Sequence, residues 1–214
     1  LQTFPKSMRA FMEAMPQWLE TKLWAPVNIR SETGFRGRPL FLSHHLSHAA
    51  SSFLVSPFDE AAILTIDGVG EWSTATVGEG RGNDIRLTRD IRFPHSLGLL
   101  YSALTYYLGF RVNSAEYKVM GLAPYGEPSC MDKFREIVHV AEDGGVHLNM
   151  KYFAYHYGLT MTNRRFDKLF GGPRRRPESK LEQRHADIAA GLQRITEEAV
   201  LRMANTLHRE TGHK

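Results

Sequence analysis

Three consecutive strand-like segments constrain the fold of this chain more than any other feature. Residues 61–66 (AAILTI) are apolar except for one threonine and are bounded by charge and glycine, as in a buried strand. Residues 74–77 (TATV) form a second candidate strand. Residues 85–93 alternate apolar and polar side chains, which predicts a third strand with one solvated face. Only short segments separate the three, so the sequence predicts a three-stranded antiparallel meander.

Glycines mark the expected turns of this meander. Gly68 and Gly70 are expected to form the first turn, and Gly78, Gly80 and Gly82 the second. Helical patterns surround the strands, so the expected fold class is α/β with flanking helices. Helices are predicted over residues 5–23 (with a break or kink at Pro16), 96–108, 131–140 and 187–210. Further short strands are predicted over residues 39–42 and 146–150, and irregular structure over 25–40 and 151–180.

Composition narrows the possible functions only a little. A net charge of +4 over 214 residues is too weakly basic to argue for nucleic acid. The single cysteine fits a reducing, cytoplasmic location, and no apolar run is long enough for a membrane span. The chain starts without Met and looks like an excised fragment of a longer protein. Residues 174–176, all arginine, are expected to be a solvated loop, with anion capture as the alternative.

A histidine pair is the first candidate for chemistry. If a helix begins after Ser43, which is a suitable N-cap, His44 and His48 share one face at i and i+4, and His45 points elsewhere. Two imidazoles at this spacing can bind one Zn²⁺ or Fe²⁺ ion. The metalloprotease pattern H-E-x-x-H has a glutamate where His45 stands, so that function loses its base. The alternative is that the histidines only cap and pack the helix start.

The second candidate is the acidic, glycine-rich segment that follows the first strand. Asp67 could hold a metal ion, and Gly68 and Gly70 would let backbone N–H groups approach a phosphate. An ordinary hairpin turn would have the same pattern. A third segment, residues 113–125, contains Lys118, which could contact a phosphate or acyl oxygen; the alternative is a solvated side chain in a loop. Two further histidines, His95 and His185, are expected to be structural.

Four long motifs make the sequence similar to a known family. They are residues 44–51 (HHLSHAAS), 64–72 (LTIDGVGEW), 93–101 (FPHSLGLLY) and 113–126 (NSAEYKVMGLAPYG). These segments resemble the O-carbamoyltransferase family of nodulation and antibiotic-tailoring enzymes. The resemblance runs from about residue 40 to the end of the chain, and residues 1–39 carry little of it.

The resemblance implies an actin-like (ASKHA, Kae1-like) domain of two ribonuclease-H-like halves, followed by a YrdC-like domain. On this basis residues 1–58 would end the first half, residues 59–214 would open the second, and the fold would be incomplete. The YrdC-like domain would make carbamoyl adenylate from carbamoyl phosphate and ATP. The Kae1-like domain would then transfer the carbamoyl group to a hydroxyl of a sugar, an antibiotic or a nodulation factor.

The same resemblance implies roles for individual residues. His44, His48 and Asp67 would be metal ligands, with Fe²⁺ favoured over Zn²⁺ or Mg²⁺. The segment Gly68, Gly70 and Glu71 would help to hold the nucleotide, and Lys118 and Asn113 would lie near the catalytic pocket. No nucleic-acid or membrane partner is expected, and the chain alone would be inactive. A tRNA threonylcarbamoyl transferase and a non-catalytic assembly domain remain as alternatives.

Overall fold

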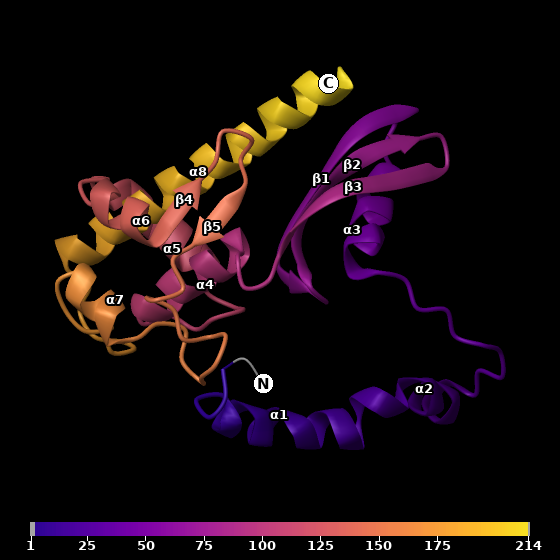
Figure 1. The fold of residues 1–214 in the computed structure, drawn as a ribbon, viewed down its shortest axis with the longest axis horizontal. Helices are drawn as coiled ribbons and strands as arrows, with labels where there is room; N and C mark the ends of the chain where they lie inside the picture. The colour runs from indigo at the N-terminus through magenta and orange to yellow at the C-terminus, as the bar shows by residue number, and fades with distance from the viewer. Residues whose placement is uncertain (1–2, 214) are drawn as a thin grey trace.

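The three-stranded antiparallel meander is confirmed in the computed structural model, which describes residues 3–213. Its strands are β1 (Glu60–Gly70), β2 (Ser73–Arg81) and β3 (Asp84–Arg92), in the order β1-β2-β3 (Figure 1). None of the helices in residues 3–213 combines the length and the apolar character needed to cross a bilayer.

The predicted glycine turns were mostly wrong, because several of these glycines are needed for packing inside strands. Gly68 and Gly70 belong to β1, and the left-handed turn residue is Glu71, with φ of 64°. Gly78 and Gly80 belong to β2: a Cβ at Gly80 would lie 2.5 Å from the Phe53 ring. Gly82, with φ of 57°, is the one residue of its predicted group that stands in the turn.

The third strand has apolar side chains on both faces, contrary to the predicted solvated face. The β2–β3 register shifts between Val77 and Gly78, whose partners are Arg89 and Leu87. Because Thr88 is the extra residue, the alternation reverses there. Ile85 and Leu87 pack towards α3, whereas Ile91 packs against the main core.

Helices cover both faces of the meander (Figure 1). Helix α3 (His44–Phe53) packs on one face through Ala49 and Phe53, which meet Ile63 of β1. Helices α4 (Leu97–Tyr107) and α8 (Gln183–Thr211) lie on the other, where Leu64 of β1 meets the main core. Alternate residues of β1 therefore face different helices, as expected for an extended strand.

The main core joins α4 and α8 to a set of short elements. These are α5 (Glu116–Leu122), the 3₁₀ turn η2 (Ala123–Tyr125), α6 (Met131–Ile137), the antiparallel strands β4 (Val138–Val140) and β5 (Val146–Leu148), and α7 (Arg164–Leu169). The predicted helix over 131–140 ends early, where β4 begins. Helix α7 lies inside the stretch that was expected to be irregular. The predicted long C-terminal helix is confirmed and starts four residues earlier than expected.

The N-terminal segment departs furthest from its prediction. Helix α1 (Met8–Glu20) continues through Pro16 without a break and is followed by the 3₁₀ turn η1 (Lys22–Trp24). The expected loop contains α2 (Ala25–Thr33), which has Pro26 in its first turn and Gly34 at its C-cap with φ of 69°. Proline at a helix start and glycine after its end are favourable, so the residues read as loop signals are helix boundaries. Residues 39–42 form no strand.

The arginine run is not the solvated loop that was expected. Arg175 is buried and its Nε donates to the Leu108 carbonyl at 2.5 Å. The Arg174 guanidinium lies 3.6 Å from the centre of the Tyr106 ring and its Nε donates to the Tyr106 carbonyl. Arg174 and Arg175 therefore dock on the C-terminal end of α4, where backbone carbonyls need donors, whereas Arg176 is exposed as expected.

Candidate metal centre

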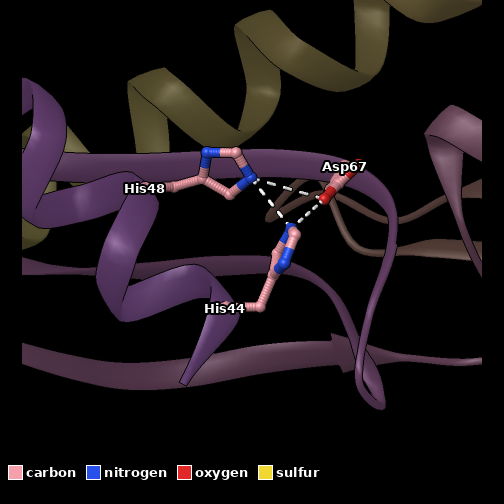
Figure 2. A group of neighbouring side chains, drawn as sticks. All are labelled: His44, His48 and Asp67. Carbon is pink, nitrogen blue, oxygen red and sulfur yellow. Dashed lines mark hydrogen bonds and ion pairs between the residues drawn. The ribbon is translucent and has the colours of Figure 1, made fainter. Parts of the chain in front are cut away.

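The start of α3 places two histidines on one face, as predicted. Ser43 is the N-cap: its backbone is extended and its Oγ accepts from the Leu46 N–H at 3.4 Å. His44 and His48 then lie one helical turn apart, with their rings directed towards the end of β1 (Figure 2). Both side chains remain about half exposed.

The third member, Asp67, comes from an irregular part of β1. Ile66 pairs with Ala75 and Gly70 pairs with Ser73, so β1 has extra residues between these two pairs. Asp67 is the first of them, and its carboxylate lies on the same side of the strand as α3 (Figure 2). Its Oδ1 accepts the Gly68 N–H at 2.6 Å, which leaves Oδ2 free to face the histidines.

The three side chains have the spacing of ligands to one ion. The His44 Nε2 atom contacts Asp67 Oδ2 (Figure 2). The His48 Nε2 atom lies 2.9 Å from His44 Nε2 and 3.4 Å from Asp67 Oδ2. With metal–ligand distances of about 2.1 Å, neighbouring ligand atoms lie about 3.0 Å apart in octahedral and about 3.4 Å apart in tetrahedral coordination. The two His48 separations match these values, and all three ligand atoms lie within 4.8 Å of one another, which is close enough for them to hold one ion.

Electrostatics favour an ionised carboxylate at this position. Partial burial of Asp67 acts to raise its pKa, but the Gly68 N–H and the two histidines outweigh it and hold the pKa below the ordinary value. Asp67 is therefore negative at neutral pH and can accept from a histidine or bind a cation. Two nitrogens and one anionic oxygen form a site that attracts positive charge.

The histidine between the pair points away from the site, as predicted, and the structure shows that it anchors the helix. His45 is buried; its Nε2 lies 2.9 Å from the Ser73 carbonyl and its Nδ1 lies 2.6 Å from Thr65 Oγ1. A carbonyl can only accept, so Nε2 donates to Ser73, while Nδ1 is hydrogen-bonded to the Thr65 hydroxyl. Thr65 in turn lies 2.7 Å from Thr76 Oγ1. Both ring nitrogens are used, and α3 is fixed to β1 and β2.

Two close contacts position the ligands, and sequence reasoning missed both roles. A Cβ at Gly70 would lie 2.2 Å from His44 Cδ2, so Gly70 gives the imidazole room. A Cβ at Gly98, in the first turn of α4, would lie 2.5 Å from the Asp67 carbonyl oxygen. Ser96 adds a hydrogen bond of 2.6 Å to the Gly68 carbonyl. A glycine inside a predicted helix, as at residue 98, was the one signal in the sequence.

The other predicted site residues are only partly brought together. Glu71 lines a cavity of about 300 Å³ that also borders His44 and Arg92. Lys118 is exposed on α5, and Asn113 has φ of 63° with its N–H donating to Glu116 Oε1 at 2.7 Å. Within residues 3–213, no hydrogen bond or ion pair connects Lys118 or Asn113 to the metal-ligand candidates. Their catalytic roles stay predictions.

Two histidines that were expected to be structural have structural contacts. His95 Nδ1 accepts the Leu148 N–H at 3.0 Å, and His185 Nδ1 accepts the Glu182 N–H at 2.9 Å in a reciprocal cap of α8. Burial lowers the pKa of both imidazoles, so each is neutral and able to accept.

Comparison with known proteins finds a protein-family model that matches this sequence. A family model described as the carbamoyltransferase N-terminus matches residues 1–214. The match includes residues 1–39, so the expectation that this segment carries little resemblance was wrong.

Three individual proteins are also similar to this chain. An uncharacterized protein of Synechocystis sp. is 52% identical over 97% of this chain and 35% of its own length. Nodulation protein NolNO of Sinorhizobium fredii is 36% identical over 81% of the chain and 24% of its length. Nodulation protein NolO of Bradyrhizobium diazoefficiens is 32% identical over 80% of the chain and 29% of its length. The chain thus spans about a third or less of these relatives.

Proposed function

Since this chain belongs to the carbamoyltransferase family, whose N-terminal model it matches throughout, we propose that it supplies a metal centre for carbamoyl transfer to a substrate hydroxyl. The observation that carries the proposal is the cluster of His44, His48 and Asp67. Two imidazoles and one carboxylate are the ligands of many Fe²⁺ centres and also suit Zn²⁺, whereas Mg²⁺ prefers oxygen. We therefore favour Fe²⁺, then Zn²⁺.

The proposed reaction is an acyl transfer. The acceptor oxygen bonds to the carbamoyl carbon of carbamoyl adenylate, the carbon–phosphate oxygen bond breaks, AMP leaves, and the hydroxyl proton passes to a base. To make the donor, water would split carbamoyl phosphate into carbamate and phosphate, and a carbamate oxygen would then attack the α-phosphate of ATP, with release of pyrophosphate. When bound, the ion would polarise the acyl or phosphate oxygen. His44, His48 and Asp67 would hold it, and the Gly68 N–H orients the Asp67 carboxylate for that task.

Further parts of the proposal rest on the family resemblance. Gly68, Gly70 and Glu71 would border the nucleotide, and the cavity beside His44 that includes Glu71 is compatible with this. Lys118 and Asn113 would act near the reacting groups. A meander with helices on both faces fits half of an actin-like, Kae1-like domain. A YrdC-like domain would be the partner that makes the donor, and a sugar, antibiotic or nodulation factor would be the acceptor.

Metal analysis tests the centre directly. The chain is loaded with Fe²⁺ without oxygen or with Zn²⁺, desalted, and analysed for metal by mass spectrometry. We expect about one ion per chain, lost in His48→Ala and in Asp67→Ala because two ligands cannot hold the ion as tightly as three. His147→Ala, an exposed histidine of β5, is the matched control and should keep the ion. Unchanged metal content in Asp67→Ala would contradict the proposed centre.

Activity is tested separately. The chain alone, with carbamoyl phosphate, ATP and a hydroxylated acceptor, should give no turnover, because it spans about a third or less of its relatives. A full-length relative should release AMP in the presence of acceptor and lose this activity when the residue equivalent to His48 is replaced. Turnover by the chain alone would show that the donor-forming step does not need the regions of the relatives that lie outside the match.

A further inference from the structure

A second pocket, far from the metal centre in the chain and sharing none of its residues, has a strongly basic lining. It is a cavity of about 770 Å³ between the N-terminal segment and the loops around α7. Four cationic side chains border it: Lys6, Lys151, Arg164 and Arg165. We call it the basic pocket. Its volume lies in the range of small-molecule sites.

The positive charge of the basic pocket is not neutralised by its own lining. No aspartate or glutamate is among the residues that border the cavity. Within the part of the chain that the structure describes, none of the four cations has an ion pair. The nearby Glu136 carboxylate is engaged by the Tyr152 hydroxyl at 2.6 Å, and Asp167, beside Arg164, does not border the cavity. Four like charges around one hollow repel each other unless an anion binds.

Neutral groups in the pocket suit a ligand that is more than a bare ion. The His156 Nδ1 atom is buried and has no hydrogen-bond partner among residues 3–213. Burial and then the charge of Lys6 lower the pKa of His156, so the ring is neutral and offers one donor and one acceptor. Phe4 and Tyr157 add aromatic surface to the wall. Lys6 lies 5.8 Å above the Tyr157 ring, which holds its charge at the edge of the cavity.

We propose that the basic pocket binds a small molecule that carries two or more phosphate groups. Guanidinium groups pair with phosphate oxygens through two hydrogen bonds, and the two lysines add point charges. A single carboxylate would leave most of this charge uncompensated, whereas a diphosphate carries enough negative charge to match it. The four cations come from three separate chain segments around one cavity and not from an extended stripe, which favours a small molecule over nucleic acid.

Calorimetric titration of the metal-free chain 1–214 with pyrophosphate, at low ionic strength, tests the basic pocket. Removal of metal keeps the other site out of the measurement. We expect binding that is weakened at least about tenfold in the double variant Lys151→Ala/Arg165→Ala, because two of four charge-assisted contacts are lost. The matched control, Arg86→Ala/Arg194→Ala, removes two exposed arginines outside the pocket and should bind as the parent does.

Three outcomes would overturn the proposal. The first is no detectable pyrophosphate binding at millimolar concentration. The second is an equal loss in the pocket variant and the control variant, which would indicate general attraction to a positive protein. The third is tighter binding of a single-stranded RNA oligonucleotide than of pyrophosphate, with dependence on both pairs of residues. Circular dichroism of each variant shows that the fold is kept, and none of these outcomes bears on the metal centre.

Discussion

At residue 70, the absence of a side chain decides where the His44 ring can lie. A Cβ there would overlap His44 Cδ2 at 2.2 Å. We predict that Gly70→Ala displaces the half-exposed imidazole and lowers metal affinity about tenfold to hundredfold, as loss of ligand positioning does. Thermal stability should change little, because a half-exposed ring can move into solvent. Metal titration and thermal unfolding measure the two effects.

Gly68→Ala is the control for this prediction. The nearest atom to a Cβ at Gly68 is Leu99 Cδ2, at an ordinary contact distance of 3.8 Å. The backbone N–H that orients Asp67 is kept, so metal affinity should equal that of the parent. Equal affinities of the Gly70→Ala and Gly68→Ala variants would show that the His44 position does not depend on residue 70.

Single residues could be predicted where one local rule was enough. Helical periodicity placed His44 and His48 on one face, and the strand end placed Asp67. The roles of Gly70 and Gly98 could not be predicted, because each depends on an atom from a different element. The structural role of Thr65 beneath His45 was hidden for the same reason.

At the scale of elements, the contact of α4 with β1 fixes the position of Asp67. Gly98 approaches the Asp67–Gly68 peptide so closely that a Cβ would lie 2.5 Å from the Asp67 carbonyl oxygen. We predict that Gly98→Ala destabilises the chain by about 1–3 kcal/mol, because the helix must move away from the strand. Urea unfolding measures the loss.

A second helical glycine provides the matched control. Gly121 in α5 has open space around its Cβ position. Gly121→Ala should therefore be neutral or stabilise the chain by up to about 1 kcal/mol through helix propensity. If both substitutions had the same effect on unfolding, the close α4–β1 contact would not be the cause.

Helices were predicted well where a helical spacing of apolar residues extends over several turns. They were predicted poorly where the segment is short and contains proline or glycine at its ends. The extended apolar spacing of α8 and the capped helix α4 could be read directly. Helix α2 was missed because Pro26 and Gly34, which start and end it, were interpreted as loop residues. The docking of Arg175 under α4 depends on a tertiary contact that no local pattern contains.

At the scale of the whole molecule, the N-terminal helices leave an apolar surface uncovered. Helix α1 has no buried residue, and Phe11, Met12 and Leu19 are more than half exposed. Exposed surfaces of this kind bind hydrophobic dyes and promote association. We predict that the isolated chain enhances anilinonaphthalene sulfonate fluorescence and that its apparent mass rises with concentration in light scattering.

A pair of double variants separates apolar character from charge. Phe11→Glu/Leu19→Glu should lower dye fluorescence and association, because it places two charges on the apolar face of α1. Ala14→Glu/Gln17→Glu adds the same charge at other exposed positions of that helix and should leave both nearly unchanged. Equal effects of the two variants would attribute association to net charge.

The fold class and the meander could be predicted, but the arrangement of the N-terminal segment could not. The three strand patterns and the helical patterns around them predicted the α/β class, and the family resemblance from residue 40 onwards agrees with the family-model match. The actin-like assignment stays a prediction. The segment before residue 40 packs few side chains, so its hydrophobic pattern indicates helices but not where they lie.

Because side chains of β1 point to alternate faces of the sheet, the number of residues before Asp67 decides which face its carboxylate occupies. Three side chains of β1 meet α3: Ile63 through an apolar contact, Thr65 through its hydroxyl and Asp67 through its carboxylate. Leu64, which lies between the first two, meets the main core instead. The Asp67 carboxylate therefore faces α3 because Asp67 lies two residues after Thr65 and four after Ile63, which places all three side chains on one face of the strand. Deleting one residue between Thr65 and Asp67 would turn it towards the opposite face, where no rotamer could return it. The two-residue period of a strand and the four-residue spacing of a helix together encode the triad.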